Sequence, residues 1–213
     1  MPTPARTVLV PPERLARWFE NFSTRHGAVE LTLGGAGLRA AADDGTSAEA
    51  RLPFERRYDG PNDVPAFAAA ADLAATRLTW GLLLVRKGGF AVAVVHGGTV
   101  TTSKVGQRHV QGRTKAGGQS QQRFARRRDN QARQAYEAAA QHAHRLLTGT
   151  HLDALVCGGD RSAVEAVLAD PRLAGPAAVR TGPWLAVPDP RRAVLDQAVL
   201  DGRSAAITLT ETP

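Results

Sequence analysis

Residues 78–110 read LTWGLLLVRKGGFAVAVVHGGTVTTSKVGQRHV, and this stretch decides the fold of the larger part of the chain. Three runs rich in Val, Leu and Thr are separated by two Gly-containing turns, Lys87-Gly88-Gly89 and His96-Gly97-Gly98. Short apolar runs joined by such turns are typical of antiparallel strands. We therefore expect a three-stranded meander with strands at 78–86, 90–96 and 99–110.

A long helix is predicted after this meander and after a loop at 111–118. Ser120 is its candidate N-cap and Gly149 its C-terminal stop. Alanines recur along one side of the helix, which allows it to lie close against a sheet. The rest of the chain predicts a strand at 152–157, a helix at 161–168, a short strand near Val179 and a helix at 191–200. This alternation predicts an α/β sandwich.

The first 75 residues have a different pattern. Pro11 and Pro12 can start a helix that continues to about Arg25. Short strands separated by Gly-rich and Asp-Gly turns follow, and an alanine-rich stretch forms a connecting helix; the strands are expected at 29–33, 37–42 and 48–52, and the helix at 64–75. We therefore expect a small N-terminal helix-and-strand unit over residues 1–75 and a second domain over 76–213.

Composition narrows the class of protein. The chain has 213 residues with 43% hydrophobic content, enough to bury a core in one domain or two small ones. Its one cysteine, Cys157, excludes an internal disulfide and a cysteine-based metal cluster. The N-terminus lacks the apolar core of a signal peptide, and no apolar run is long enough for a membrane span. The sequence predicts a cytoplasmic protein.

Positive charge is concentrated in one part of the chain. The formal net charge is +7, and the stretch from Lys104 to Arg145 carries ten Lys or Arg residues against two acids, a net charge of +8. One strongly basic surface on an otherwise near-neutral protein indicates a polyanionic partner, although arginine-rich helices are also often simply solvated. The candidate RNA-contacting residues are Lys104, Arg108, Arg113, Lys115, Arg123, Arg126, Arg127 and Arg128.

The basic stretch contains the sequence GGQSQQRFARRR at residues 117–128. Gly117 and Gly118 have no side chains, so this part of the chain can enter a narrow space. Gln119 has no titratable proton, so it can orient a ligand or a water by hydrogen bonds but cannot act as a general base. The residues therefore favour catalysis by positioning, next to a surface suited to a phosphate backbone.

This stretch resembles the GGQS-x-x-RFA-R-x-R signature in the catalytic middle domain of eukaryotic and archaeal peptide chain release factors. The similarity runs from about Trp80 to the C-terminus and is weak outside the motif. The stop-codon-reading and partner-binding domains of those factors are not recognisable here. The chain therefore resembles release-factor-like ribosome-rescue proteins, including the actinobacterial members of the Vms-type peptidyl-tRNA hydrolase family.

The resemblance implies a fold, a reaction and a set of roles. The fold is the ribonuclease-H-like α/β core of the release factor domain, with the GGQ loop at residues 111–120. The reaction is ribosome-dependent hydrolysis of the ester in peptidyl-tRNA, without stop-codon decoding. Gln119 is the implied catalytic residue, since its backbone N–H stabilises the developing charge and its side chain helps to place water. Gly117 and Gly118 permit entry to the peptidyl transferase centre.

The remaining implied partners are the ribosomal large subunit, ribosomal RNA and peptidyl-tRNA. No cofactor, metal or membrane is expected, and we expect a monomer. The sequence departs from the stop-codon-reading factors at residues 112–116, where Gly-Arg-Thr-Lys-Ala replaces a short His-Gly-basic run. Two alternatives stay open: a nuclease that removes the 3′ end of the tRNA, and a non-enzymatic factor that binds the ribosome and recruits others.

Other candidate sites have simpler interpretations. The glycines at 34–37 lack the Lys-Ser/Thr of a phosphate-binding loop, which favours a hairpin turn. Asp160 is most simply a helix N-cap. His142 and His144 are two residues apart, so on a helix they point in different directions and cannot form a metal-ligand pair. Cys157 lies in an apolar strand and is predicted to be a buried thiol.

Overall fold

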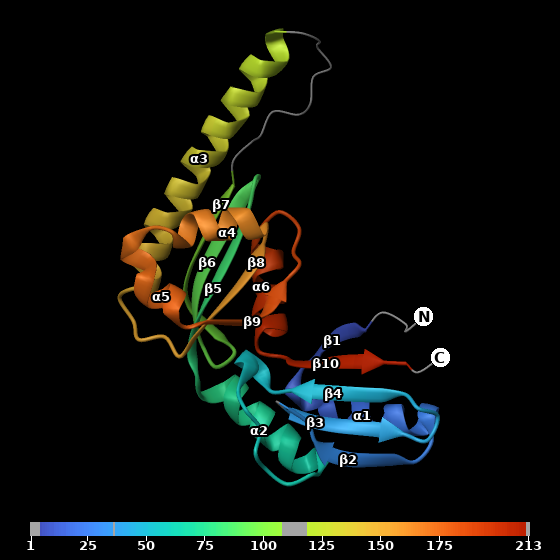
Figure 1. Ribbon diagram of the computed structural model, residues 1–213. Helices are drawn as coiled ribbons and strands as arrows, with labels where there is room; N and C mark the ends of the chain where they lie inside the picture. The colour runs from blue at the N-terminus through green and yellow to red at the C-terminus, as the bar shows by residue number, and fades with distance from the viewer. Residues whose placement is uncertain (1–4, 36, 108–118, 212–213) are drawn as a thin grey trace.

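The computed structural model of the protein describes residues 5–35, 37–107 and 119–211, and for residues 107 and 119–132 it concerns the course of the backbone. The described residues form two five-stranded sheets with helices packed against both (Figure 1). The predicted α/β fold, with a mixed sheet packed between helices and a smaller N-terminal helix-and-strand unit, is confirmed.

The larger sheet has the strand order β7-β6-β5-β8-β9. Its strands are β5 (Thr79–Arg86), β6 (Gly89–His96), β7 (Thr99–Gln107), β8 (Ala154–Gly159) and β9 (Arg180–Leu185). The first three form the predicted antiparallel meander, and β8 and β9 add to it in parallel to β5. This mixed order is the one of a ribonuclease-H-like sheet.

Both faces of the larger sheet are covered by helices, and the alternation of side chains along β5 shows how. Leu83 and Val85 point to a cluster that includes alanines of α3 (Gln119–Leu147) and residues of α4 (Arg161–Leu168). Leu82 and Leu84 point to the other face, where α6 (Arg192–Gly202) contributes Leu195. Because both faces are buried, the strand sequence is a continuous apolar run instead of an alternating one.

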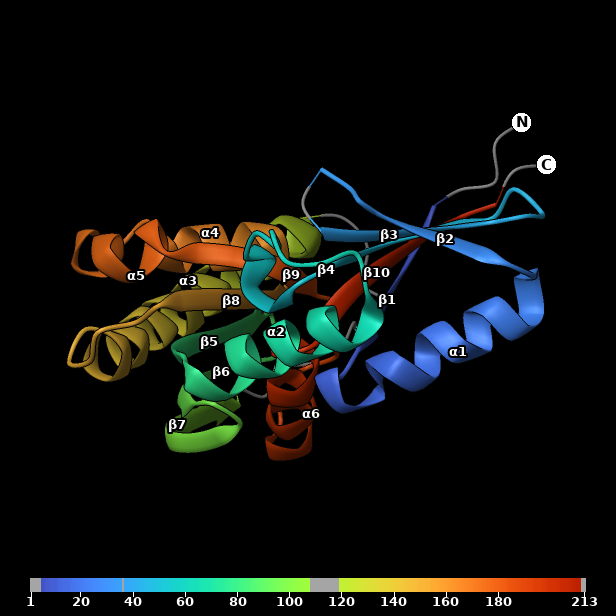
Figure 2. The ribbon, with the colours of Figure 1, turned by 90° about the horizontal axis from the view of Figure 1, so that it is seen from below.

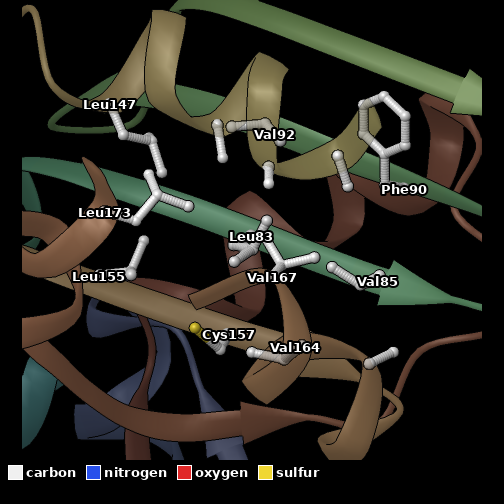
Figure 3. Close-up of a cluster of buried hydrophobic side chains, with 14 of the residues drawn as sticks. Leu83, Val85, Phe90, Val92, Leu147, Leu155, Cys157, Val164, Val167 and Leu173 are labelled. Atoms are coloured by element: carbon white, nitrogen blue, oxygen red, sulfur yellow. The ribbon is translucent and has the colours of Figure 1, made fainter. Parts of the chain in front are cut away.

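Figure 3 shows the first of these clusters, in which Phe90 and Val92 of β6 and Leu147 of α3 pack together with Val164 and Val167 of α4 and with Leu173. Leu173 belongs to a short segment after α4 that consists of η3 (Pro171–Leu173) and α5 (Ala174–Ala178). The sequence analysis did not predict these two short helices.

The smaller sheet has the order β1-β10-β4-β3-β2 and is antiparallel throughout. Its strands are β1 (Arg6–Val10), β2 (Val29–Leu33), β3 (Gly37–Ala42), β4 (Ser47–Arg51) and β10 (Ala205–Thr210). The predicted hairpin turn at the glycines is confirmed, because Leu33 pairs with Leu38 across it.

Two helices, α1 (Leu15–His26) and α2 (Val64–Arg77), cover one face of the smaller sheet (Figure 2). They pack through Phe19, Phe22 and Phe67 on strand residues such as Leu38 and Ile207, all of which are buried. The helix starts follow from local chemistry. Two prolines and the 3₁₀ turn η1 (Pro12–Arg14) precede α1, and the Asp63 carboxylate caps α2 by accepting a 2.7 Å hydrogen bond from Ala66 N.

Strand β10 lies in the sheet of the N-terminal unit, between β1 and β4, although it follows α6 in the chain. The sequence analysis predicted neither β10 nor β1. Their pairing joins residues about 200 positions apart, such as Arg6 and Leu209. The proposed boundary near residue 75 stays a prediction, with the addition that residues 205–210 share a sheet with the N-terminal unit.

Most other predicted elements begin and end within two or three residues of their observed bounds. None of the helices in the described ranges is both long and apolar enough to cross a membrane.

Candidate nucleic-acid interface

The candidate site is built around the start of α3. Gly117, Gly118, Arg108, Arg113 and Lys115 lie outside the described residues. Gln119 is the first residue of α3. The helix therefore includes Ser120 in its first turn, and the prediction that Ser120 is the N-cap is wrong.

Helix α3 divides into an inner half that packs on the sheet and an outer half that extends beyond it (Figure 1). In the inner half, Ala135, Ala139, Ala143 and Leu147 are buried. The small side chains of the three alanines let the helix lie close to β6, as the alanine pattern predicted. Gln119 stands about 24 Å farther along the axis than Ala135, since an α-helix rises about 1.5 Å per residue.

The outer half of α3, defined as residues 119–132, contains four of the predicted RNA-contacting arginines. They are Arg123, Arg126, Arg127 and Arg128. Positions 123, 126 and 127 have i, i+3 and i+4 spacing, so they share one side of the helix, whereas position 128 falls on another side. The first turn contains no acidic residue. These four arginines thus belong to the part of the helix that lies farthest from the core.

The other described candidate, Lys104, lies at the base of this helix. It is an exposed residue of β7, paired with Val92 of β6. On the neighbouring α3, the imidazole of His142 stacks on Phe90 with ring centroids 5.4 Å apart. Burial lowers the pKa of His142, and the positive charges of Arg145 and Lys104 lower it further. Lys104 of β7 therefore lies beside the inner half of α3, away from the outer arginines.

The ends of the parallel strands form one continuous edge of the larger sheet. Arg86, the last residue of β5, pairs with Gly89, which in turn pairs with Gln107 at the end of β7. On the other side of β5, Val85 pairs with Gly159 at the end of β8. The chain that leads to α3 therefore leaves the sheet from the edge at which β5 and β8 also end.

Arg86 contacts both the segment that follows β8 and the segment that follows β9 at this edge. Its Nε lies 3.6 Å from Oδ1 of Asp160 and 3.8 Å from Oδ1 of Asp189, and its Nη1 donates a 2.9 Å hydrogen bond to the Val187 carbonyl. Asp160 occupies the N-cap position of α4, as predicted, but its side chain makes no capping hydrogen bond. Its carboxylate is instead turned to Arg86, so both acids at this edge are partly neutralised.

A stacked pair at the same edge was not found from the sequence. The guanidinium carbon of Arg161, at the start of α4, lies 4.4 Å from the ring centroid of Trp184 in β9. This is a cation–π contact. From the sequence, Trp184 is predicted only as an isolated large residue. The local sequence pattern does not indicate a contact between residues of two different elements.

Two titratable groups near this edge of the larger sheet, Tyr136 and Cys157, are held in their neutral forms. Burial raises the pKa of Tyr136 on α3, and the nearby charge of Asp160 raises it further. Burial also raises the pKa of the Cys157 thiol to about 12. Cys157 is 1% exposed, so its prediction as a buried core thiol is confirmed. Within residues 5–35, 37–107 and 119–211 there is no group of three side chains suited to a metal ion.

Comparison with solved structures gives relatives with low sequence identity. The chain is similar to the Vms1 mitochondrial localization core, with 12% identity, a TM-score of 0.43 and coverage of 91% of this chain and 81% of that one. It is also similar to Pelota of Archaeoglobus fulgidus, with 10% identity, a TM-score of 0.30 and coverage of 93% and 66%. No curated protein matches the sequence.

The described residues form an α/β protein in which helices cover both faces of a mixed five-stranded sheet. The model of the actinobacterial and chloroflexi VLRF1 release factor family matches residues 78–208, and the chain belongs to this family. The matched stretch begins at β5 and ends within β10, so it covers the whole larger sheet and α3. Membership gives the chain a release-factor-like role at the ribosome.

Proposed function

We propose that the protein is a ribosome-dependent peptidyl-tRNA hydrolase that releases nascent chains from stalled ribosomes or large subunits. The observation that carries the proposal is that α3 begins at Gln119, directly after the two glycines. The first four backbone N–H groups of an α-helix have no partner within the helix. The N–H of Gln119 is one of these, at the positive end of the helix dipole.

These donors suit the chemistry of ester hydrolysis. Water attacks the ester carbonyl carbon, negative charge develops on the carbonyl oxygen, and the bond to the ribose 3′ oxygen then breaks to give a peptide acid and a free tRNA hydroxyl. A backbone N–H at a helix start can stabilise the developing charge. The Gln119 carboxamide can hold the attacking water but cannot take its proton, so that proton must go to another group of the ribosomal site.

The shape of α3 supports the same function. The outer half of the helix extends from the core and ends at Gln119 (Figure 1). A tip held about 24 Å from the packed residues can enter a deep site while the folded core stays outside it. The arginines of the outer half suit the RNA phosphates that line such a site, since guanidinium groups pair with phosphate in a bidentate manner. We propose that the protein works in the cytoplasm as a monomer, without reading a stop codon.

The test is a release assay with purified protein and stalled large subunits that carry labelled peptidyl-tRNA. We expect Gln119→Ala to slow peptide release by about 100-fold, the usual effect of losing one positioned transition-state donor. The matched control is Gln121→Ala, which removes the same side chain two positions farther along the helix and therefore on another side. Gln121→Ala should release peptide at the wild-type rate.

The released peptide and the tRNA are both examined, because together they distinguish ester hydrolysis from the two alternative functions. Ester hydrolysis leaves a tRNA of full length with an intact 3′ end. A tRNA shortened at its 3′ end would instead identify a nuclease. If wild-type protein bound the stalled subunits but released no peptide, it would be a non-enzymatic binding factor and the proposal would be wrong.

A further inference from the structure

We propose that Arg161 and Trp184 form a second RNA-binding site, which takes an unpaired base of an RNA strand. The site lies on the edge of the larger sheet from which the chain leaves toward α3. The inference deepens the proposed function, since it assigns a contact for the same RNA partner. It rests on a stacked side-chain pair that the release mechanism does not use.

The geometry of the pair suits a base. Trp184 is partly buried and packs against the hydrophobic cluster that underlies α3 and α4. The guanidinium of Arg161 lies over its ring at 4.4 Å, and Arg161 itself is exposed. A guanidinium group is planar, so its free face can stack on a nucleobase while its edge bonds to a phosphate. Tryptophan and arginine thus form the first two layers of a stack that a base can extend.

The charge of Arg161 is available for this role. In the part of the chain that the structure describes, Arg161 forms no ion pair. The two nearby acids, Asp160 and Asp189, both face Arg86, with Nε–Oδ1 distances of 3.6 and 3.8 Å. Arg86 therefore screens the carboxylates that would otherwise compete with RNA phosphate for Arg161.

The elements that carry the pair are held in place before any ligand binds. Arg161 starts α4 immediately after the β8 loop, and Trp184 lies in β9, which pairs with β8. Arg86 bonds to the Val187 carbonyl, three residues beyond Trp184, and reaches Asp160, one residue before Arg161. Because one side chain links both segments, the stacking surface loses little entropy on binding.

The position of the pair relates it to the tip of α3. Strands β7 and β9 are at opposite sides of the sheet, four strand spacings or about 19 Å apart. Arg161 begins α4, and α4 packs against α3, so an RNA strand that contacts the outer half of α3 can also reach Arg161. Bases in an RNA duplex are stacked inside the helix, so only a single-stranded segment can offer one. The partner is therefore single-stranded RNA.

The test uses the full-length chain with a fluorescently labelled single-stranded 12-nucleotide RNA. Alanine replacement of a residue that stacks on a base costs on the order of tenfold in affinity. We therefore expect Arg161→Ala to raise the dissociation constant by about tenfold, and Arg161→Lys, which keeps the charge but not the plane, to raise it by several-fold. The control is Arg17→Ala, which removes the same charge from an exposed position of α1.

A second measurement follows Trp184 directly. In a Trp18→Phe background the other tryptophan, Trp80, is fully buried, so changes in emission on binding report on Trp184. Single-stranded RNA should change this emission in a saturable way. Inorganic polyphosphate, a polyanion without bases, should not change it.

Three results would overturn the inference. These are an Arg161→Ala variant with wild-type affinity, full rescue by Arg161→Lys, or the same emission change with polyphosphate as with RNA. Unfolding midpoints of the Arg161 variants and of Arg17→Ala are measured alongside. If Arg161→Ala is less stable, the comparison of Arg161→Lys with wild type keeps the test valid. The assay contains no peptidyl-tRNA, so its outcome is independent of whether the protein hydrolyses the carboxylic ester of that substrate.

Discussion

His142 of α3 stacks on Phe90 of β6, with ring centroids 5.4 Å apart and an angle of 27° between the ring planes. The contact fixes the inner half of α3 against the sheet at the level of Lys104. It also places an imidazole in a partly buried position beside two positive charges, Arg145 and Lys104, which together with burial lower the pKa of His142. We therefore expect the attachment of α3 to the sheet to weaken at acidic pH.

The first prediction concerns the pH dependence of stability. The folded-state pKa of His142 lies below the unfolded value of 6.5, so at acidic pH the unfolded chain binds more protons at this residue. The contribution of His142 to the free energy of unfolding should therefore be unaffected above the unfolded pKa and should decrease as the pH falls below it. Urea denaturation of wild type and His142→Gln at pH 7.5 and 5.5 measures this difference. An equal loss of stability in both proteins on acidification would contradict the prediction.

The second prediction concerns the close packing of α3 on the sheet. Ala139 lies in the inner half of α3 and is fully buried. Ala139→Leu must therefore displace the neighbouring side chains and should cost about 1–3 kcal/mol in the free energy of unfolding. The matched control is Gln134→Leu, at an exposed position of the same helix; it should change stability by less than about 0.5 kcal/mol. Thermal or urea unfolding distinguishes the two. Similar stabilities for both variants would mean that the helix does not pack as described.

The third prediction concerns the membership of β10 in the smaller sheet. Ile207 is fully buried in the cluster shared with α1 and α2, so Ile207→Ala should lower the free energy of unfolding by about 2–5 kcal/mol. Thr208, the next residue, points to the opposite face, where its hydroxyl lies 3.1 Å from that of Thr7. Thr208→Ala should cost less than about 1 kcal/mol. The ratio of the two losses in urea denaturation reports the side of the strand that faces the core, and a reversed ratio would contradict the assigned register.

The fourth prediction concerns the basic outer half of α3. Each phosphate contact contributes about 0.7–0.9 to the slope of log K against log salt, so the double variant Arg127→Ala/Arg128→Ala should bind ribosomal RNA more weakly and with a slope smaller by about 1 to 2. Affinity measured from 50 to 200 mM salt gives the slope. The control is Arg17→Ala/Arg25→Ala, which removes two exposed charges from α1. If both double variants reduce the slope equally, net charge and not this helix determines binding.

The sequence predicted the larger sheet well for a physical reason. Its central strands are buried on both faces, so their apolar runs are long and their turns are marked by glycine. Helix α3 was equally clear, since its alanines recur with helical spacing and pack against β6. Local sequence determines these features, and they include the segment on which the proposed site depends.

The sequence did not reveal contacts that depend on distant residues. Strand β10 is short, and only its pairing with β1 on one side and β4 on the other makes it an interior strand of the smaller sheet. The contact of Arg161 with Trp184 joins a helix start to a parallel strand that follows later in the chain. Neither of these contacts produces a periodic pattern in the amino-acid sequence. Such contacts become visible only when the order of the strands is known.

The place of β10 between β1 and β4 has a consequence for the synthesis of the protein. Residues 205–210 are made after all of the larger sheet, so until then β1 has no neighbour and β4 exposes an unpaired edge. Open strand edges attract other chains. During synthesis, these strand edges must therefore stay unpaired with foreign strands until β10 is made and takes its place between β1 and β4.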